Sequence, residues 1–475
     1  MGTVEERLGE MREAFRSGKT KCEKWRRSQL MALLALVREE EEGIFSALNR
    51  DLGKHRAEAF RDEVGVLIKS INFALSSLKQ WMAPKSVKVP LVSFPSSATV
   101  VPEPLGVVLL FSSWNFPIGL ALEPIIGAFS AGNVVALKPS ELAPSSAEFL
   151  AEAIPRYLDG AAVKVFLGGP SVGSQLLEQR WDKILFTGSP RVGRVVMAAA
   201  AEHLTPVILE LGGKCPAIVD SIGSSEQKVA AKRLVAGKWG PCCGQACVGI
   251  DYILVERQFA STLIDMLRRT VKSLYGDSRN LSRIVNRQHF MRLEGLLKDP
   301  SVSASVVHGG RFDSDNLKIE PTILLDPPLD SEIMTEEVFG PLLPIITLEK
   351  IGDSIAFVRD RPKPLAIYVF SNDEALKKRV VAETSSGSVT FNDTMIQFAV
   401  DTLPFGGVGG SGFGRYHGKF SFDAFSHEKA VMRRQFLLDF PLRYPPWNET
   451  KLRFLRDVFH FDYFGLLLVM MGLKK

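Results

Sequence analysis

The sequence lacks the features of a secreted protein. Its 475 residues include only five cysteines, and three of these fall within positions 242–247. An odd, clustered set of thiols fits a reducing compartment better than a disulfide framework. The first seven residues include three charged side chains and no apolar core of the length that a secretory signal requires. We therefore expect a cytoplasmic protein.

The chain also lacks a strong excess of either charge. It has 58 basic and 53 acidic side chains, a formal net charge of +5, and no basic block with interleaved aromatic residues. This balance argues against nucleic acid as a partner. Apolar residues make up 46% of the chain, which at this length is enough for more than one core, so we expect two or three domains.

Two regions alternate between short apolar strands and helices, the pattern of parallel sheets covered on both faces. Residues 5 to about 80 precede them and show helical spacing of apolar side chains. Residues 87–101 fit an extended arm or hairpin, and the glycine-rich run 405–414 fits a loop that turns tightly or lies close to another segment. The expected strands are 107–111, 134–137, 163–166, 184–186 and 207–209 in the first region, with helices from about 120, 145 and 191, and 217–219, 252–255, 343–347, 365–370 and 389–391 in the second.

A cysteine and a glutamate, each close to glycines, are the strongest candidates for chemistry. Cys247 ends the segment Gly-Gln-Ala-Cys at 244–247, and Glu210 begins Glu-Leu-Gly-Gly-Lys at 210–214. A thiolate attacks a carbonyl carbon, and a nearby carboxylate activates the water that later releases the acyl group from sulfur. Taken alone, Glu210 is equally well explained as the partner in a structural ion pair. A metal site is a weaker hypothesis, because the clustered cysteines lack the paired spacing of zinc ligands.

Three further segments follow predicted strands, where open α/β sheets bind ligands. Gly188 and Ser189 lie between a strand and a helix start, which suits a pyrophosphate, although the three-glycine dinucleotide fingerprint is absent. Lys138 and Glu141 follow another strand and are either a pair that binds the two hydroxyls of a ribose or a solvated loop. Asn115 follows a third strand, where its amide is either a donor to a developing oxyanion or an ordinary turn residue.

Seven segments, in order and over roughly residues 10 to 435, resemble the signatures of the aldehyde dehydrogenase superfamily. The short N-terminus and residues 416–427 resemble its class 3 branch in the plant-like form. Cys242 and Cys243 are a departure, because the family usually has asparagine before Gly-Gln. The seven segments are 114–117 (Trp-Asn-Phe-Pro), 138–141 (Lys-Pro-Ser-Glu), 186–189 (Phe-Thr-Gly-Ser), 210–214, 244–247, 336–341 (Glu-Glu-Val-Phe-Gly-Pro) and 403–407 (Leu-Pro-Phe-Gly-Gly).

The resemblance implies an α/β fold with a Rossmann-like NAD-binding domain, a second α/β catalytic domain and a small bridging or oligomerisation arm. It implies that Cys247 is the nucleophile, that Asn115 and the Cys247 backbone amide form the oxyanion hole, and that Glu210 is the general base. The implied coenzyme is NAD, and NADP stays open. Lys138 and Glu141 would bind the adenosine ribose, Gly188, Ser189 and Gly193 the pyrophosphate region, and Glu337 and Phe339 the nicotinamide riboside.

The same resemblance divides the chain into parts with different expected roles. We expect a coenzyme-binding domain in 1–83 and 103–210, a catalytic domain in 211–394, bridging or oligomerisation segments in 84–102 and 395–435, and a C-terminal tail in 436–475 that is a candidate for membrane association.

The predicted function is NAD(P)-dependent oxidation of aldehydes, either medium- or long-chain aliphatic or aromatic, to carboxylic acids through a cysteine thiohemiacetal and thioester. The alternative is a catalytically weakened relative with a structural or membrane-associated role. We expect a small-molecule aldehyde substrate and a homodimer. The apolar run 464–473 is shorter than the roughly 20 residues that span a bilayer. With basic residues at both ends it is either a peripheral membrane contact or a helix packed on protein.

Overall fold

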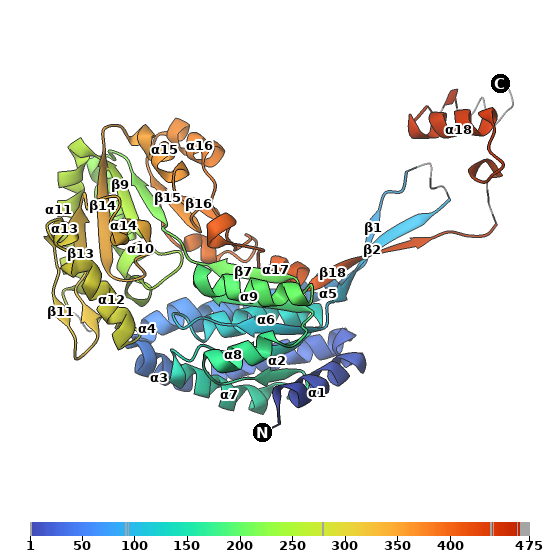
Figure 1. Ribbon diagram of the computed structural model, residues 1–475, viewed down its shortest axis with the longest axis horizontal. Helices are drawn as coiled ribbons and strands as arrows, with labels where there is room; N and C mark the ends of the chain where they lie inside the picture. The colour runs from blue at the N-terminus through green and yellow to red at the C-terminus, as the bar shows by residue number, and fades with distance from the viewer. Residues whose placement is uncertain are drawn as a thin grey trace. The chain divides into compact units, whose positions relative to one another are not determined.

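The computed structural model describes residues 2–90, 93, 95–277, 280–437, 439, 441–462 and 464–465. The chain divides into two compact units. The first consists of Met1–Leu78 and Pro104–Ser426, and the second of Lys79–Glu103 and His427–Lys475. The first unit contains two parallel sheets, and both contribute to the candidate active site (Figure 1).

The first sheet has six strands: β3 (Val107–Phe111), β4 (Val134–Lys138), β5 (Val163–Val165), β6 (Lys183–Gly188), β7 (Val207–Leu211) and β17 (Gly412–Phe413). Their order is β17-β7-β6-β3-β4-β5, and all neighbours are parallel except β17 and β7. The chain winds outward from β3 to β5 and then returns to β6 on the other side of β3. Ligands of open α/β sheets bind at such a change of direction, outside the carboxyl ends of the strands.

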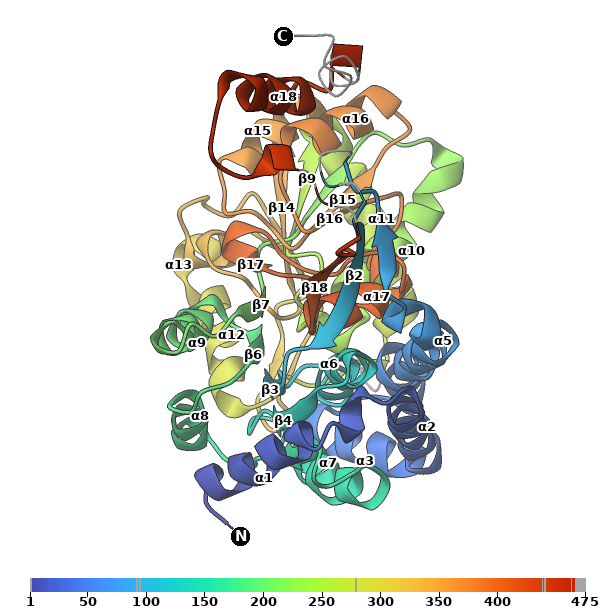
Figure 2. The same cartoon turned by 90° about the vertical axis from the view of Figure 1, so that its right-hand side faces the viewer.

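Helices cover both faces of this sheet, with α8 and α9 on one side and α6 on the other (Figure 2). The core under α8 and α9 also includes α1 and alternate side chains of β3, namely Val107, Leu109 and Phe111. Helix α6 is apolar and buried all round, as expected of a helix enclosed between a sheet and outer helices. The helical elements are α1 (Val4–Arg16), α2 (Glu23–Glu39), α3 (Glu41–Leu52), α4 (Arg56–Ala59), the π-helical turn η2 (Phe60–Val64), α5 (Gly65–Met82), α6 (Gly119–Ala131), α7 (Pro144–Tyr157), α8 (Pro170–Leu177), α9 (Pro190–Glu202) and α17 (Gly418–Ala424).

The second sheet has seven strands: β8 (Pro216–Val219), β9 (Tyr252–Glu256), β10 (Val306–His308), β13 (Thr322–Leu325), β14 (Leu342–Leu348), β15 (Ala366–Phe370) and β16 (Ser388–Phe391). Their order is β10-β13-β14-β9-β8-β15-β16, and only β10 is antiparallel to its neighbour. A small hairpin of β11 (Phe312–Asp313) and β12 (Lys318–Ile319) lies apart from it.

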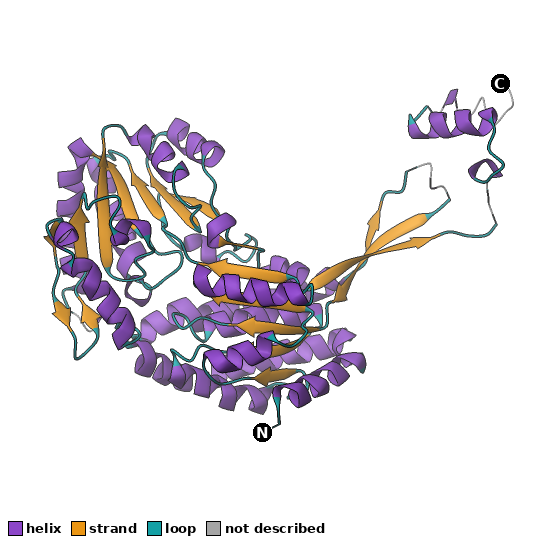
Figure 3. Ribbon diagram, in the orientation of Figure 1, coloured by secondary structure: helices purple, strands orange, loops and turns teal. Residues whose placement is uncertain are grey.

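Side chains of the second sheet alternate between two cores, as a strand period of two requires. On β9, Ile253 and Val255 pack with α10 and α11, whereas Tyr252 and Leu254 pack with α12 and the helices near it. Figure 3 shows these helices around the orange strands. They are α10 (Ser224–Trp239), α11 (Arg257–Tyr275), α12 (Arg287–Lys298), α13 (Pro300–Ser303), α14 (Glu332–Thr335), α15 (Ser354–Arg359) and α16 (Glu374–Glu383).

The second unit contains a three-stranded sheet and the helix α18 (Glu449–Phe459). The strands are β1 (Lys85–Val87), β2 (Ser97–Pro104) and β18 (Ser426–Arg433), in the order β1-β2-β18. Among the described residues, no helix combines the length and the apolar character needed to cross a membrane. Most of the apolar run predicted at 464–473 lies outside the described residues, which end at Gly465.

The structure confirms the helices predicted before residue 80, the hairpin near 87–101 and all the predicted strands. The prediction missed β17, which consists of two residues of the glycine-rich run. Gly412 pairs there with Glu210, and a Cβ on Gly412 would lie 1.9 Å from the Leu209 carbonyl oxygen. The run therefore does lie close to another segment, but the pairing is long-range and leaves no periodic pattern.

Candidate active site

The predicted site residues of the first sheet lie at the carboxyl ends of four neighbouring strands. Asn115 follows β3, Lys138 ends β4, Gly188 ends β6, and Glu210 is the penultimate residue of β7. Strand pairing aligns these ends, with Thr187 of β6 opposite Glu210. The sheet therefore brings four separate sequence segments to one edge, where its winding changes direction.

The turn from β6 into α9 is suited to an anion. Ser189 has extended backbone, and its hydroxyl accepts a hydrogen bond of 3.4 Å from the Val192 N–H. The 13-residue helix α9 begins here, so the positive end of its dipole faces the carboxyl edge of the sheet. Gly193 is buried, and a Cβ there would lie 2.9 Å from Leu211 Cδ2, so glycine permits α9 to pack on β7. Its predicted contact with a pyrophosphate stays a prediction.

A lysine and a glutamate form a pair at the end of β4. Lys138 is buried, and its ammonium group contacts the carboxylate of Glu141. The Glu141 side chain is 37% exposed and therefore accessible to a ligand. The pair offers a donor and an acceptor side by side, as recognition of adjacent hydroxyls requires.

Glu210 holds its carboxyl group out of water. The residue is only 3% exposed, and neither carboxyl oxygen has a hydrogen-bond partner among the described residues. Burial raises the pKa of Glu210 well above its usual value. No cationic side chain in the described part of the chain pairs with it, which argues against a structural ion pair. A carboxyl group with a raised pKa is a suitable proton acceptor near neutral pH.

The loop before Cys247 has an unusual backbone. Cys242, Cys243 and Gly244 have φ angles of 49°, 53° and 79°, in the left-handed region that favours glycine. A Cβ on Gly244 would lie 2.5 Å from the carbonyl oxygen of Gly340, so a larger residue does not fit without a shift.

Gln245 fixes the shape of this loop. It is fully buried, and its amide donates to the carbonyls of Cys242 at 2.9 Å and Arg283 at 3.0 Å. Its Oε1 accepts a bond of 3.1 Å from the Val285 N–H. The sequence motif contained Gln245, but the motif alone gave no indication of this role.

Asn115 reaches the same loop from the first sheet. Its Nδ2 donates to the Gln245 carbonyl at 2.9 Å, and its Oδ1 has no partner among the described residues. The amide has a second N–H, which is a donor for a ligand oxygen. Cys247 lies two residues beyond Gln245 and is partly exposed. The structure thus brings the amide of Asn115 and the loop of the thiol together.

Acidic groups surround the thiol of Cys247. Burial raises the pKa of Cys247 to about 12, and the charges of Glu337 and Glu210 add to this effect. Burial also raises the pKa of Glu337 to about 8, with a contribution from Asp251. A Cβ on Gly212 would lie 2.0 Å from Glu337 Oε2, so Gly212 leaves the space that the carboxyl group occupies. Glu337 therefore lies against Gly212 and close enough to the Cys247 thiol to affect its charge.

Lys214 and Asp251 hold the loop that contains Glu337, a role that the sequence did not reveal. The ammonium group of Lys214 contacts the Asp251 carboxylate and donates to the Glu336 carbonyl at 3.0 Å. Asp251 Oδ1 accepts a bond of 2.9 Å from the Val338 N–H. These contacts fix the loop from both sides of Glu337.

Phe339 packs against the Asn115 loop. Its ring meets Trp114 edge-on, with ring centroids 5.3 Å apart, and its φ is 48°. This contact joins the loop before β14 to the loop after β3. The predicted contact of Phe339 with a nicotinamide riboside stays a prediction.

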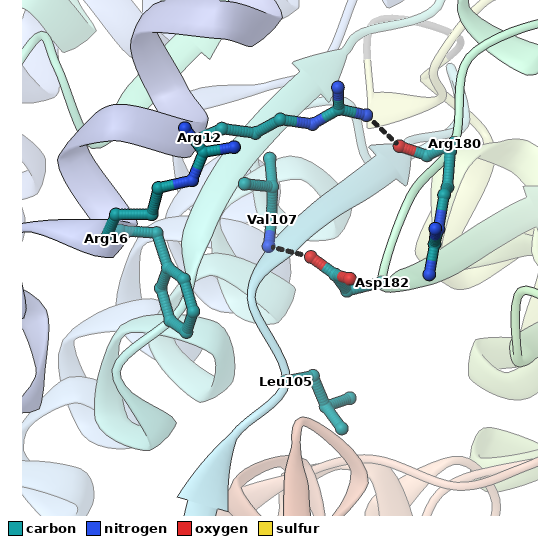
Figure 4. Close-up of a pocket in the computed structure, with 7 residues that line it drawn as sticks. Arg12, Arg16, Leu105, Val107, Arg180 and Asp182 are labelled. Atoms are coloured by element: carbon teal, nitrogen blue, oxygen red, sulfur yellow. Dashed lines mark hydrogen bonds between the residues drawn. The ribbon is translucent and has the colours of Figure 1, made fainter.

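A cavity of about 380 Å³ lies at the opposite end of the first sheet (Figure 4). The Val107 N–H at the start of β3 donates to Asp182 at 2.7 Å there. The cavity contains none of the predicted site residues and lies away from the carboxyl edge, so we assign the chemistry to that edge. Its lining residues are Arg12, Phe15, Arg16, Leu105, Val107, Arg180 and Asp182.

Comparison with known proteins agrees with this geometry. The model of the aldehyde dehydrogenase family matches residues 2–431. This chain belongs to the aldehyde dehydrogenase family. Aldehyde dehydrogenase family 3 member F1 of Arabidopsis thaliana is 58% identical to it over 478 residues, which cover 100% of this chain and 99% of that protein. The substrate-bound structure of Staphylococcus aureus AldH is 41% identical, with a TM-score of 0.93, over 97% of this chain and 100% of that one.

The aldehyde dehydrogenase fold and NAD(P)-dependent oxidation of aldehydes therefore hold for this chain. Two similar structures, each 25% identical with a TM-score of 0.81, hold a coenzyme. The Methanocaldococcus jannaschii glyceraldehyde-3-phosphate dehydrogenase GapN is complexed with NADP, over 91% of this chain and 94% of that one. An indole-3-acetaldehyde dehydrogenase is complexed with NAD+, over 90% and 88%. The coenzyme of this aldehyde dehydrogenase is NAD or NADP.

The carboxyl edge of the first sheet fits such a dinucleotide. The positive end of the α9 dipole suits a pyrophosphate, and the Lys138–Glu141 pair, whose carboxylate is accessible, suits a ribose. The two lie on either side of β3, since β6 and β4 are its neighbours. A ligand with a phosphate group and sugar hydroxyls therefore finds a complementary group on each side.

We predict that the coenzyme-free enzyme reacts slowly with thiol reagents at neutral pH. Because the pKa of Cys247 is raised, its thiolate fraction is small there and grows about tenfold per pH unit. The rate of Cys247 alkylation by iodoacetamide, measured by peptide mass spectrometry, should keep rising from about pH 7 to about pH 10. A plateau by about pH 9.5, as for an unperturbed thiol with a pKa of about 8.5, would contradict this account. Protein unfolded in urea provides the control, because its Cys247 should show that plateau.

Proposed function

We propose that Cys247 is the nucleophile, that Asn115 and the Cys247 N–H stabilise the oxyanion, and that Glu210 is the general base. The strongest support is the hydrogen bond that joins Asn115, after a strand of the first sheet, to the loop of Cys247. Glu210 adds to this, because its buried carboxyl group has no hydrogen-bond partner among the described residues. The backbone N–H of Cys247 lies close to its own sulfur atom. A carbonyl oxygen bound at the thiol is thereby within reach of two donors.

In the first half of the reaction, Sγ of Cys247 attacks the aldehyde carbon. A sulfur–carbon bond forms, and the carbonyl oxygen becomes an oxyanion that accepts from Asn115 and the Cys247 N–H. The oxidised nicotinamide, when bound, supplies a hydride acceptor and a positive charge. A positive charge near sulfur offsets the acidic groups and favours the thiolate. The tetrahedral carbon loses its hydrogen as a hydride, the carbonyl forms again, and Cys247 then carries a thioester.

In the second half, this thioester is hydrolysed. Glu210 takes a proton from water as the water oxygen attacks the acyl carbon. The oxyanion donors stabilise the tetrahedral intermediate, the sulfur–carbon bond breaks, and the carboxylic acid leaves. Burial raises the pKa of Glu210, which makes its carboxylate a stronger base than an exposed one.

We propose medium- or long-chain aliphatic or aromatic aldehydes as substrates. Cys247, Met395 and Phe398 are partly buried against an apolar core that includes Tyr368 and Phe405. An apolar substrate tail gains free energy on entering such surroundings, whereas a polar one loses hydration. A panel of aldehydes of increasing chain length, with NAD and with NADP, tests this by kcat/KM.

The coenzyme residues are also proposals. Lys138 and Glu141 bind the adenosine ribose, Gly188, Ser189 and Gly193 face the pyrophosphate, and Glu337 and Phe339 lie at the nicotinamide riboside. The negative charge of Glu141 opposes a 2′-phosphate, so this arrangement favours NAD over NADP.

We predict that Cys247→Ala lowers dehydrogenase turnover by more than about a thousandfold, because no other group holds the acyl intermediate. Cys242→Ala and Cys243→Ala serve as matched controls and should keep at least about half of the activity, since both thiols are buried and inert. Coenzyme reduction followed by absorbance measures all three. Loss of turnover in a folded Cys243→Ala variant would show that the nucleophile is misassigned.

Glu210→Gln should slow deacylation while leaving the first hydride transfer intact, because the amide keeps the shape of the side chain and removes the base. We expect a pre-steady-state burst of reduced coenzyme close to one equivalent per active site, followed by a steady rate lower by about a hundredfold. The wild-type enzyme in the same stopped-flow experiment is the control. If the burst and the steady rate were both lost, Glu210 would act in a step before the acyl-enzyme forms, and its assigned role would be wrong.

We propose a cytoplasmic homodimer with a peripheral membrane contact. The five cysteines are all free, which suits the cytoplasm because thiols are kept reduced there. Strands β16 and β18 are at the edges of their sheets, where a second copy can pair with free backbone groups. Helix α18 has exposed Phe459 at its end and basic residues along its length, which suits an anionic membrane surface.

Deletion of residues 446–475 should leave oxidation of soluble aldehydes unchanged, because it removes none of the proposed catalytic residues. Full-length protein alone should sediment with anionic vesicles and be released by salt, since an interfacial helix with basic residues binds reversibly. Neutral vesicles are the control. Full-length protein that stays in solution, together with a truncated form that dissociates in analytical ultracentrifugation, would show that the tail packs on protein.

A further inference from the structure

The segment of residues 54–63 contacts the Asn115 loop and the loop that precedes Cys247. None of the seven signature segments includes it. It runs from Lys54 through α4 into the π-helical turn η2. The side chains of Lys54 and Glu63 are 0% exposed, and Nζ of Lys54 lies 2.5 Å from Oε1 of Glu63. A fully buried ion pair is costly to desolvate and has to be explained by the contacts that it makes.

Lys54 and Glu63 hold the Asn115 loop at both ends. Nζ of Lys54 donates to the carbonyl of Asn115 at 2.8 Å. Oε2 of Glu63 accepts from the N–H groups of Ile118 and Gly119, both at 2.9 Å, where α6 begins. The backbone that presents the Asn115 amide is therefore tied down on each side of its turn.

Phe116, within this turn, adds a third contact. The centroid of its ring lies 4.3 Å from Nζ of Lys54, within the range of a cation–π interaction. Burial opposes the charge of Lys54, but the acidic groups around it, Glu63 first among them, together outweigh that effect, so the pKa of Lys54 is raised. The group is a cation throughout the working range of the enzyme.

Glu58 connects the same segment to the nucleophile loop. Its Oε1 accepts a bond of 2.8 Å from the Cys242 N–H, and Ser282 Oγ donates to both carboxylate oxygens. Glu58 and Glu63 are five residues apart and would point to different sides of a regular α-helix. The π turn, in which the Gly65 N–H bonds to the carbonyl five residues earlier, brings them closer in direction.

We propose that Lys54 and Glu63 are positioning residues for the oxyanion donor, and that segment 54–63 sets the distance between Asn115 and Cys247. This inference rests on the function proposed above for those two residues. Neither Lys54 nor Glu63 touches the reacting atoms; both act through the backbone of the Asn115 loop. A displacement of about 1 Å at such a donor costs up to about a hundredfold in rate.

The test is the double variant Lys54→Met/Glu63→Gln. The double variant removes the Lys54–Glu63 ion pair as a unit, and glutamine keeps an oxygen for the N–H groups of α6, but methionine makes no bond to Asn115. The matched control is Glu42→Gln, which removes an exposed ion pair with Arg56 on the same segment and should keep wild-type kinetics.

We expect kcat of the double variant to fall by about tenfold to a hundredfold, with KM within about twofold. Alkylation of Cys247 by iodoacetamide should stay within about twofold of wild type, because alkylation needs a thiolate but no oxyanion donor. Unchanged kcat in the folded variant overturns the inference, and so does a parallel fall of kcat and alkylation, which indicates a general structural role.

If the double variant does not fold, Glu63→Asp replaces it. Aspartate is shorter by one methylene group, which draws the carboxylate away from the N–H groups at the start of α6. In Glu63→Asp we again expect kcat to fall while the rate of Cys247 alkylation stays near that of the wild type. A kcat equal to that of the wild type overturns the inference. Turnover by Cys247→Ala is measured beside these variants. Activity there refutes the proposed function itself, whereas failure of the Lys54 and Glu63 variants to separate the two rates refutes only the positioning role.

Discussion

The hydrogen bond of 2.9 Å between the Asn115 amide and the Gln245 carbonyl joins the catalytic loops of the two sheets. An oxyanion donor is effective only within hydrogen-bond distance of the reacting oxygen, so the loops have to keep their relative position to within a fraction of an ångström. Both residues are almost fully buried, which excludes water as a competitor for the contact. The Lys54–Glu63 pair on one side and the Gln245 side chain on the other preserve this geometry.

Burial also determines the protonation states of the site. It raises the pKa of Glu210 and, to about 12, that of Cys247. Burial thus favours the protonated form of both groups, and ligands that change the local charge shift this balance. Burial raises the pKa of Cys243 to about 12 as well, and Glu58 adds to it. Cys242 and Cys243 are buried, whereas Cys247 is partly exposed, so the two extra thiols are side chains of a tightly folded loop rather than rival nucleophiles.

The sequence was sufficient to predict most strands of the two large sheets, though not β10, β13 or β17, and the edge at which the site lies. Strand periodicity is local, and the ends of β3, β4, β6 and β7 place Asn115, Lys138, Gly188 and Glu210 together once the sheet is parallel. The supports of the site were not predictable in this way. Lys54 is 61 positions from Asn115, and only tertiary contact relates the two. The position of the Glu337 carboxyl group against Gly212 likewise depends on a fold that no local pattern encodes.

The central claim is that Cys247 carries the acyl group during turnover. Mass spectrometry of the enzyme during turnover tests it most directly. Enzyme mixed with an aldehyde and NAD, quenched in acid within the first turnovers and digested, should show the acyl mass of the substrate on the peptide that contains Cys247, because the thioester has to accumulate on the nucleophile. Fragmentation of that peptide should place the added mass on Cys247. An acyl group on Cys242 or Cys243, or turnover with no acylated peptide under conditions where Glu210→Gln also shows none, would contradict the account.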